Sequence, residues 1–482
     1  MEFIMKRIIS VLVIVCLLSL LPNWNASAAS ADVKKPYAIA TVQANGSKKV
    51  TATYATFAAA NKNFKRTNNT VLLYKNIIIK MNSGIVVAKA PRVDGITHIY
   101  PTAELKANRH TTGVAYGNEL EYVSASEKAI KVKYAGQEGY VSHSEAYLLP
   151  SAAMGGNSSY YQVNQSRFIT HVVYNHAYKR QDAYFYGKAP STVKPGRYTS
   201  WDGINFTAQD GKKAAPFYQY FNLLPFRTMT NYSAAELDAL IMKRLRAKEA
   251  EAKKKPQYRN ATKKSKLIGL GRILKEQERT NRVNALMVLA QAIHESDYGM
   301  SPKAQKLNNL FGIEVYDGNP EAGKKYSSPG ESVRALVENV LNPTYIPADS
   351  GYANGSHFGN KYRGVNVRYA MDQYWGQKIA GHLYLLDKEM GGKDFIRNKN
   401  AYKLYENTTG LNVRSTPEVM TIPNNKIYRY NKSGFVVAVL GSEKKTDYTW
   451  HTIISDRLDA PYGYVARGEA SLIYLRPLTI AK

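Results

Sequence analysis

The sequence predicts a multidomain α+β protein in which a mainly helical segment is flanked by small all-β units. Three observations support this fold class. The chain has 482 residues, which is long enough for several domains of ordinary size. Short alternating segments separated by turn residues occur toward both ends of the chain, as is typical of small β domains. Between them, residues 231–395 carry helical patterns that begin at a capping box, Ser233-Ala-Ala-Glu236.

Residues 1–28 predict a secretory signal peptide. A basic pair at residues 6–7 precedes an apolar run over residues 8–21, and small residues follow at 26–28. The run is too short to cross the hydrocarbon core of a bilayer, which is about 30 Å thick. Cys16, the only cysteine, lies inside this segment, and Val15 before it is not the small residue that a lipoprotein anchor requires. We therefore expect an exported chain that has no lipid anchor or disulfide and relies on its packed cores.

The chain is strongly basic. It contains 66 Lys and Arg residues against 37 Asp and Glu residues, which gives a formal net charge of +29 at pH 7. Such a charge attracts polyanions. Because export makes nucleic acid a poor partner, the charge favours the anionic polymers of a cell wall. The basic run over residues 243–266 is interpreted equally well as a solvated surface and as a contact with such a polymer.

Three segments precede the helical part. Residues 29–92 predict a small α+β unit, with a helix at 55–64 and strands at 37–41, 49–53, 71–75 and 77–80. Residues 93–152 predict short strands only, which fits a small SH3-like β-barrel. Residues 153–230 are dense in Tyr and Phe. Aromatic rings of this kind can stack on sugars, but we favour the ordinary packing of a connecting β region.

The C-terminal residues 396–482 repeat a pattern found earlier in the chain. Leu411-Asn-Val-Arg414 opens the segment, and Gly463-Tyr-Val465 repeats the Gly139-Tyr-Val141 of the N-terminal copy. Over residues 401–480 the C-terminal copy resembles bacterial SH3-like (SH3b) domains, whereas the N-terminal copy lacks the opening motif. The resemblance implies binding of wall peptide or glycan. A passive β spacer is the alternative for the N-terminal copy.

Residues 284–298 predict a buried helix, because the segment is apolar on almost all sides. Glu295 projects from this helix near its C-terminal end, shortly before Gly299. Burial of the carboxyl group and the negative end of the helix dipole both disfavour ionisation and therefore raise its pKa. A carboxyl group that stays protonated suits a general acid. For an isolated glutamate, a simple hydrogen bond to a buried donor would be the first interpretation, but further motifs accompany this one.

Three motifs together resemble the bacterial glucosaminidases of glycoside hydrolase family 73 over residues 231–392. They are Ala290-Gln-Ala-Ile-His-Glu-Ser296, Asn308-Asn-Leu-Phe-Gly-Ile313 and Tyr369-Ala-Met-Asp-Gln-Tyr-Trp375, in that order. The resemblance implies a lysozyme-like, mainly α catalytic domain with a small β-lobe. It also implies that Glu295 is the general acid and that Tyr369 lies beside the reacting sugar. The substrate-binding residues that we expect on this basis are Asn308, Asn309, Phe311, Tyr298, Tyr326, Asp372 and Trp375.

A second catalytic carboxylate is harder to assign. The acidic residues after the second motif, which we expect in the small β-lobe, are Glu314, Asp317, Glu321 and Glu331. Among them Glu321, shortly before Tyr326, is our first choice. If none of them reaches the sugar, the substrate's own 2-acetamido group is the alternative nucleophile. The sequence leaves both possibilities open.

We therefore expect a secreted, wall-associated peptidoglycan hydrolase of the autolysin type. It would be an endo-beta-N-acetylglucosaminidase that cleaves the β-1,4 bond after N-acetylglucosamine, with SH3-like modules that hold it on the insoluble substrate. The nearest alternative is a lytic transglycosylase or muramidase on the same fold. An alternative from another class is a wall-binding adhesion protein with a decayed catalytic unit, although Glu295, Asn309 and Tyr369 are all present.

No cofactor or catalytic metal is expected. His294-Glu295 superficially resembles the start of a zinc-protease motif, but Tyr298 stands where the second histidine ligand is required. The expected partners are the glycan strands of peptidoglycan and anionic wall polymers. We expect no nucleic-acid partner, no membrane insertion after signal cleavage, and a monomer.

Overall fold

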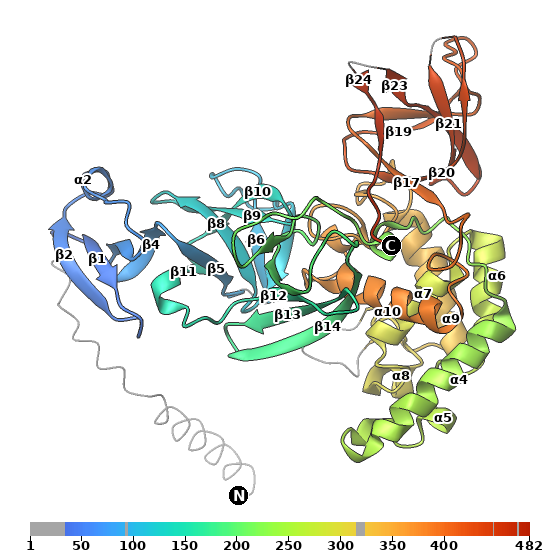
Figure 1. Ribbon diagram of the computed structural model, residues 1–482, viewed down its shortest axis with the longest axis horizontal. Coiled ribbons are helices and arrows are strands. Elements are labelled where there is room, and N and C mark those ends of the chain that lie inside the picture. The colour runs from blue at the N-terminus through green and yellow to red at the C-terminus, as the bar shows by residue number, and fades with distance from the viewer. Residues whose placement is uncertain (1–33, 92–94, 315–322, 447, 470–471) are drawn as a thin grey trace, which may run out of the picture. The chain divides into compact units, whose positions relative to one another are not determined.

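The structure is a computed structural model that describes residues 34–91, 95–314, 323–446, 448–469 and 472–482 (Figure 1). The predicted signal peptide, Asp317 and Glu321 lie outside the described residues. The chain forms two compact units, one from residues up to 84 together with 150–155, and the other from 85–149 together with 156–482. The mixed helix and sheet content that the sequence predicts is confirmed. The finer domain boundaries stay a prediction. Within the described ranges, no helix is both long and apolar enough to cross a membrane.

The first unit is a four-stranded antiparallel sheet with one short helix. The strand order is β2-β1-β3-β4, and the elements are β1 (Tyr37–Val42), β2 (Lys48–Tyr54), α2 (Phe57–Lys62), β3 (Thr70–Tyr74) and β4 (Ile77–Met81). The helix begins where the side chain of Thr56 accepts a hydrogen bond from the backbone N–H of Ala59, at 3.2 Å. Tyr37, Leu72 and Ile79 form the core of the sheet. These elements lie where the alternating pattern predicts them.

The second unit begins with a five-stranded sheet of order β10-β9-β8-β5-β11 and a separate hairpin, β6–β7. The strands are β5 (Gly84–Ala88), β6 (Ile96–Ile99), β7 (Thr112–Ala115), β8 (Glu119–Ala125), β9 (Ala129–Tyr134), β10 (Gln137–Ser142) and β11 (Ala146–Pro150). The expectation of short strands only is confirmed here, apart from the single 3₁₀ turn Ser151–Ala153 after β11. No sheet in the described part of the chain closes into a barrel, so the SH3-like form stays a prediction.

The aromatic-rich segment forms a second five-stranded sheet, of order β14-β13-β12-β15-β16. Its strands are β12 (Tyr160–Val163), β13 (Phe168–Asn175), β14 (Arg180–Lys188), β15 (Gly196–Thr199) and β16 (Thr207–Ala208). The buried core of this sheet contains Tyr161, Tyr186, Tyr198, Phe206 and Phe217. These rings are enclosed by their neighbours, so the packing interpretation of the aromatic segment is confirmed for them.

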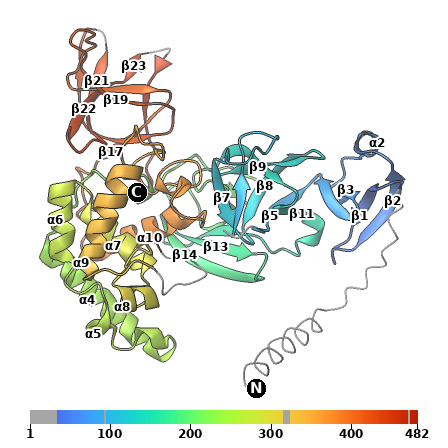
Figure 2. The same cartoon turned by 180° about the vertical axis from the view of Figure 1, so that it is seen from behind.

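The helical part follows the aromatic sheet. Its helices are α3 (Tyr220–Leu223), α4 (Ala234–Ala250), α5 (Ala261–Lys264), α6 (Gly271–Asn281), α7 (Ala285–Glu295), α8 (Pro302–Leu307), α9 (Pro329–Ala335) and α10 (Trp375–Glu389), with a π-helix at Leu336–Tyr345 and 3₁₀ turns at Glu251–Lys253, Pro256–Tyr258 and Val365–Val367. The predicted capping box is confirmed at the start of α4. α7 and α10 pack against each other in the middle of this part (Figure 2).

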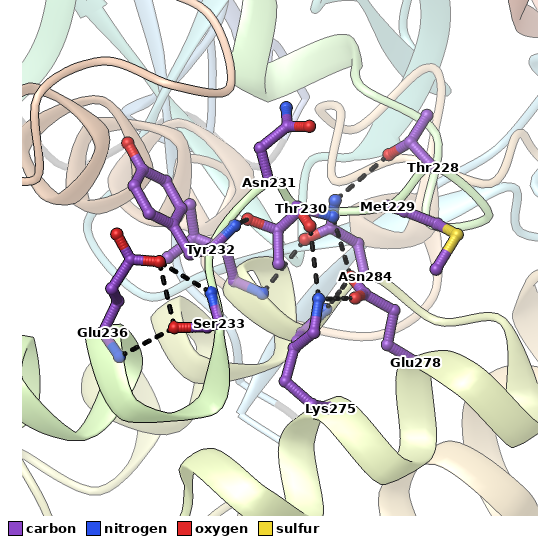
Figure 3. Close-up of polar contacts among 12 residues, drawn as sticks. Thr228, Met229, Thr230, Asn231, Tyr232, Ser233, Glu236, Lys275, Glu278 and Asn284 are labelled. Atoms are coloured by element: carbon purple, nitrogen blue, oxygen red, sulfur yellow. Dashed lines mark hydrogen bonds and ion pairs between the residues drawn. The ribbon is translucent and has the colours of Figure 1, made fainter.

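A hydrogen-bonded cluster fixes the start of α7 (Figure 3). The side chain of Asn284 accepts from the backbone N–H groups of Leu286 and Met287, at 3.0 and 3.1 Å, and so caps the helix. The buried carboxylate of Glu278 accepts from the backbone N–H groups of Thr230, at 2.8 Å, and Ala285, at 3.0 Å. The N-terminus of α7 is therefore tied both to α6 and to the segment before α4.

The C-terminal strands form a seven-stranded sheet of order β19-β18-β22-β21-β20-β17-β25. The strands are β17 (Lys403–Asn407), β18 (Leu411–Arg414), β19 (Lys426–Tyr430), β20 (Val436–Lys444), β21 (Thr449–Ile454), β22 (Tyr462–Ala466) and β25 (Leu475–Pro477), beside the small pair β23 (Gly468–Glu469) and β24 (Leu472–Ile473). Leu404, Val436, Ala438 and Ile454 belong to the same buried cluster as α7 and α10. A second buried cluster, which includes Val413, Tyr430, Val437 and Val465, lies within the sheet itself. The sheet therefore packs against the helical part and also has a core of its own.

Candidate active site

Glu295 is the last residue of α7, whose preceding residues are all buried apart from His294. The helix ends there because the hydroxyl of Ser296 donates to the carbonyl of Ala292, at 2.5 Å, and accepts from the backbone N–H of Gly299, at 2.8 Å. Asp297 and Tyr298 then adopt left-handed backbone conformations. The helix thus stops before the predicted limit at Tyr298, and this early stop leaves the Glu295 carboxyl group at its open end.

The carboxyl group of Glu295 has one strong hydrogen-bond donor. The indole Nε1–H of Trp375, at the start of α10, donates to Glu295 Oε1 at 2.7 Å. Burial raises the pKa of Glu295 above its usual range, although this hydrogen bond and the positive charge of Lys303 act in the opposite direction. The upward direction agrees with the sequence-based expectation and favours a carboxyl group that keeps its proton.

Tyr369 lies next to this pair. Its ring stacks on Trp375 with centroids 4.8 Å apart and 30° between the planes. Its hydroxyl group accepts a hydrogen bond from Nε2 of Gln291 at 2.9 Å. Burial and the nearby charge of Glu295 raise the pKa of Tyr369 well above its usual value, so this side chain remains a neutral phenol. Gln291 is a site residue that the sequence motifs did not single out. It lies one turn before Glu295 on α7, and the i, i+4 spacing, which places both side chains on one face of the helix, is the signal that could have identified it.

Asp372 supplies a second carboxylate near Glu295. Burial disfavours its charge, but the ammonium group of Lys378, at 2.5 Å, and the backbone N–H of Tyr374, at 2.9 Å, outweigh burial and lower the pKa of Asp372. The negative charge of Asp372 in turn contributes to the raised pKa of Glu295. Two carboxyl groups in one site therefore have pKa values displaced in opposite directions, an arrangement typical of acid and base pairs.

A buried lysine supports the segment that carries these residues. The ammonium group of Lys361 donates to the carbonyl of Asn366 at 3.2 Å and also to the carbonyl of Ala370. Its side chain is almost fully buried, and burial lowers the pKa of Lys361 to about 7. Lys361 is not predictable from the sequence, because nothing in its local pattern distinguishes it from the many exposed lysines.

The asparagine motif has a structural role in its loop. Nδ2 of Asn309 donates to the carbonyls of Ile313, at 2.9 Å, and Lys324, at 3.1 Å, while its Oδ1 accepts from the backbone N–H groups of Phe311 and Ile313. Asn309 is fully buried, and Phe311 belongs to the core. Asn308 ends α8 in a left-handed conformation and donates to the carbonyl of Tyr326 at 3.0 Å. Direct contact of these residues with substrate stays a prediction.

Two tyrosines complete the predicted set. Tyr298 is partly buried against the helical core, and the ammonium group of Lys248 lies 4.9 Å from the centre of its ring. Tyr326 is buried, and among the described residues its hydroxyl group has no hydrogen-bond partner. Tyr326 is also near enough to contribute to the raised pKa of Tyr369. The structure thus brings Glu295, Tyr369, Trp375, Asp372 and Tyr326 to one region.

The expectation that Glu331 lies in a β-lobe is wrong. Glu331 lies in the first turn of α9, where its backbone N–H donates to the N-capping hydroxyl of Ser328 at 3.2 Å and its carboxylate pairs with Arg334. The capping Ser328 and the following proline start a helix here. Glu314 lies 3.6 Å from the ammonium group of Lys324 and is exposed. Glu321, our first choice for a second catalytic carboxylate, lies outside the described residues.

In the part of the chain that the structure describes, no group of three or more His, Cys, Asp or Glu side chains could hold a metal ion.

Comparison with known families agrees with this geometry. Residues 271–388 match the family model Glucosaminidase, described as mannosyl-glycoprotein endo-beta-N-acetylglucosaminidase. This segment is therefore similar to the glucosaminidase domains of glycoside hydrolases. The matched range includes Glu295, Tyr369, Asp372 and Trp375, so the similarity covers the side chains that the structure brings together.

Two curated proteins of Streptococcus pneumoniae, from strains TIGR4 and R6, are similar to this chain. Both carry the name "Putative endo-beta-N-acetylglucosaminidase" and are 28% identical to it over 292 residues, or 58% of this chain. The aligned region spans 39% of one relative and 36% of the other. The chain therefore matches well under half the length of these relatives.

Solved structures of two autolysins are more distant. Autolysin E of S. aureus, in complex with the muropeptide NAM-L-ALA-D-iGLU, is 17% identical, with a TM-score of 0.26, 40% of this chain covered and 87% of that chain. The Major Bifunctional Autolysin is 16% identical, with a TM-score of 0.24 and coverage of 36% and 68%. TM-scores of this size are too low to relate the folds as wholes.

Proposed function

We propose that this protein is a peptidoglycan hydrolase that cleaves the β-1,4 bond after N-acetylglucosamine, with Glu295 as the general acid. The observation that carries the proposal is the Glu295 carboxyl group, which ends a buried helix, has a raised pKa and receives one hydrogen bond from Trp375 at 2.7 Å. A glycosidic oxygen needs a proton when its bond breaks, and a carboxyl group with a raised pKa keeps its proton to higher pH and can supply it.

In the first step, Glu295 donates its proton to the leaving oxygen, and positive charge develops on the sugar ring. Neutral Tyr369, beside Glu295, borders the space in which this charge forms. Ionised Asp372 contributes negative charge to the same region and keeps the Glu295 proton in place before reaction. The attacking group is either the substrate's 2-acetamido oxygen or a water molecule that a second carboxylate activates.

We further propose that the protein is exported and acts at the cell wall. The signal-peptide pattern in residues 1–28 and the net charge of +29 support this. The C-terminal sheet, in which β18 carries the Leu411-Asn-Val-Arg414 motif, is proposed to be an SH3-like module that contacts the wall. These assignments concern where the protein acts and what it binds, in addition to the reaction that it catalyses.

Digestion of purified peptidoglycan followed by mass spectrometry of the products tests the reaction. We expect fragments with a reducing N-acetylglucosamine end. Glu295→Gln is the matched control, because the amide keeps the shape of the side chain but has no acidic proton, and its turnover should fall by about 10²–10⁴-fold. A folded Glu295→Gln variant that keeps a tenth of the wild-type turnover would refute the role of Glu295.

The alternatives give other products. A lytic transglycosylase would release anhydro-muramic ends, and a muramidase would release reducing muramic ends. Binding to the wall without any cleavage would indicate an adhesion protein. Each of these results would replace the proposed reaction.

A further inference from the structure

Gln291 lies behind the two partly exposed side chains of the proposed active site. Glu295 and Tyr369 both keep part of their surface exposed, whereas Gln291 is fully buried and Trp375 is 2% exposed. The buried Trp375 donates to Glu295 at 2.7 Å. In the same way, Nε2 of the buried Gln291 donates to the hydroxyl oxygen of Tyr369 at 2.9 Å. Gln291 is therefore out of reach of a sugar, and its hydrogen bond connects it to the reaction through Tyr369.

Other contacts fix the ring of Tyr369 but not its hydroxyl proton. The ring stacks on Trp375 with centroids 4.8 Å apart, and the ring of Tyr345 meets it edge-on at 5.5 Å. The backbone N–H of Tyr369 donates to the carbonyl of Val365 at 3.0 Å. These contacts set the plane of the phenol, but its O–H bond can still rotate. The direction of the hydroxyl proton therefore depends on the hydrogen bond from Gln291.

That hydrogen bond directs the proton away from the protein interior. Nε2 of a glutamine only donates, so the hydroxyl oxygen of Tyr369 is the acceptor. A phenol has a single O–H proton, and this proton must then point away from Gln291. Because Gln291 lies on the buried side of Tyr369, the proton points toward the exposed side. The opposite orientation of the amide would place its oxygen against the hydroxyl group and draw the proton inward.

The amide of Gln291 is costly for the stability of the fold. Its Oε1 atom is buried, and among the described residues it has no hydrogen-bond partner. A buried acceptor without a donor destabilises a protein, and an apolar side chain of similar length would avoid this cost. The hydrogen bond that the amide does make goes to a phenol of the active site. A role in the reaction explains this arrangement better than a role in stability.

We propose that Gln291 is a positioning residue that turns the O–H group of Tyr369 toward the bound sugar. This inference rests on the proposed function, which places the sugar beside Glu295 and Tyr369. A hydrogen-bond donor that is already oriented needs no rearrangement when charge develops in the transition state. Tyr369 donates a hydrogen bond to an oxygen atom of the sugar without transferring its proton, and Glu295 remains the acid.

The test is a double-mutant cycle of Gln291→Met and Tyr369→Phe. Methionine has a similar length but no N–H group. Gln277→Met is the matched control, because Gln277 in α6 is also buried, at 2% exposed, and its side-chain hydrogen bond is with Asn281, at 2.8 Å. The values of kcat and KM on soluble glycan fragments and the melting temperature are measured for each variant.

Gln291→Met should lower kcat about tenfold with little change in KM. This loss is smaller than that of removing a donor outright, because an unrestrained hydroxyl group still samples the productive direction. The melting temperature should stay the same or rise, since the unpaired Oε1 is removed. In the Tyr369→Phe background, Gln291→Met should have no further effect on kcat, because no hydroxyl group is left to orient. Gln277→Met should leave kcat unchanged.

An unchanged kcat in Gln291→Met would overturn the inference. So would an equal loss of kcat with and without the Tyr369 hydroxyl group, because Gln291 would then act on another part of the site. A loss of kcat that follows the melting temperature in both glutamine variants would show a structural role only.

A fluorinated tyrosine at position 369 gives a second measurement that needs no turnover. Burial raises the pKa of Tyr369, and the hydrogen bond from Gln291 acts in the opposite direction because it favours the phenolate. Fluorination lowers the pKa of a phenol, which allows its titration to be followed by fluorine NMR. Gln291→Met should raise the pKa of this fluorinated phenol. If the phenol donated to Gln291 instead, the same substitution would lower the pKa, and the inference would be wrong.

The two measurements separate this inference from the proposed function. A raised pKa in a chain that releases no reducing N-acetylglucosamine ends from peptidoglycan would contradict the proposed function but support the orientation of Tyr369 by Gln291. Release of those ends together with a lowered pKa would support the proposed function and contradict the inference.

Discussion

The proton on Glu295 is controlled by a small number of neighbouring groups. Burial and the charge of Asp372 favour the protonated form, whereas the Trp375 indole and Lys303 favour the ionised form. Burial prevails, and the pKa of Glu295 is raised. Because a general acid works only while protonated, activity should decline as the pH rises through this raised pKa.

Replacing Trp375 by Phe should extend activity to higher pH. The indole N–H stabilises the carboxylate form of Glu295, and its loss therefore raises the pKa of Glu295 further. The measurement is the pH profile of kcat/KM on soluble glycan fragments, with the alkaline limb expected to move upward. Tyr374→Phe, next in the chain, serves as a control that leaves the Glu295 hydrogen bond intact. A limb that stays in place, or moves downward, would contradict this account.

At the scale of a single element, α7 depends on its N-cap. Its residues are apolar and good helix formers, but its orientation is fixed by polar groups that meet at Asn284 and Glu278 (Figure 3). The helix spans the distance from this cluster to the active site, so its first residue affects the position of its last.

Asn284→Ala should lower the free energy of unfolding by about 1–2 kcal/mol. The substitution removes the acceptor for two backbone N–H groups in a buried setting and also a donor to the Thr228 hydroxyl, at 3.3 Å. Denaturant titration measures the loss. Ser301→Ala, which removes the more exposed cap of α8, is the comparison and should cost less. Equal losses in the free energy of unfolding for the two variants would show that burial does not strengthen the Asn284 cap.

At the scale of the whole molecule, the second unit is held together by contacts between distant segments. Arg227, almost fully buried, donates to the carbonyl of Asp456 at 3.1 Å and to Oδ1 of Asn342 at 2.7 Å. The hydroxyl of Ser356 donates to the carboxylate of Asp456 at 2.5 Å. The hydroxyl groups of Tyr161 in β12 and Tyr184 in β14 both donate hydrogen bonds to Oε1 of Gln377 in α10, at 3.1 and 2.8 Å. These hydrogen bonds therefore join the segments on either side of the helical part to it.

Deletion of residues 401–482 should therefore destabilise the catalytic part. The sequence alone favours an independent tether, whose loss weakens wall binding more than cleavage of soluble fragments. The packing of Leu404, Val436, Ala438 and Ile454 in the helical core implies instead that deletion exposes apolar surface. It should therefore lower the melting temperature and reduce activity on walls and on soluble fragments alike. Thermal unfolding and both assays measure this. If the melting temperature is unchanged and activity is lost on walls only, the interpretation of this segment as an independent tether would be correct.

Wall binding by the full chain should fall steeply with salt. The net charge of +29 acts at long range, and the Debye length shrinks from about 10 Å at 0.1 M to about 3 Å at 1 M ionic strength. Removal of anionic polymer from the wall should weaken binding again, whereas cleavage of small neutral fragments should respond much less. A pull-down on native and stripped walls across a salt series measures this. Binding that is indifferent to both treatments would assign the charge to another partner.

The sequence by itself determined the elements whose burial pattern is local. The strands of the first unit, the capping box of α4 and the buried helix that carries Glu295 follow from alternation and helical periodicity, although this helix ends at Glu295 rather than at the predicted Tyr298. The upward direction of the Glu295 pKa was also predictable, because a carboxyl group on an apolar helix is desolvated wherever that helix packs.

Only the tertiary structure decided which distant groups meet. Trp375 reaches Glu295 from 80 positions away, and residues of the C-terminal sheet pack into the core of the helical part. The amide of Asn309 is used by its own loop, although its sequence motif favours a substrate contact. The periodicity of apolar residues along the chain predicts whether a side chain is buried. Which residues it then contacts depends on how the helices and strands pack. That packing is set by the summed shape and polarity of segments far apart in the chain.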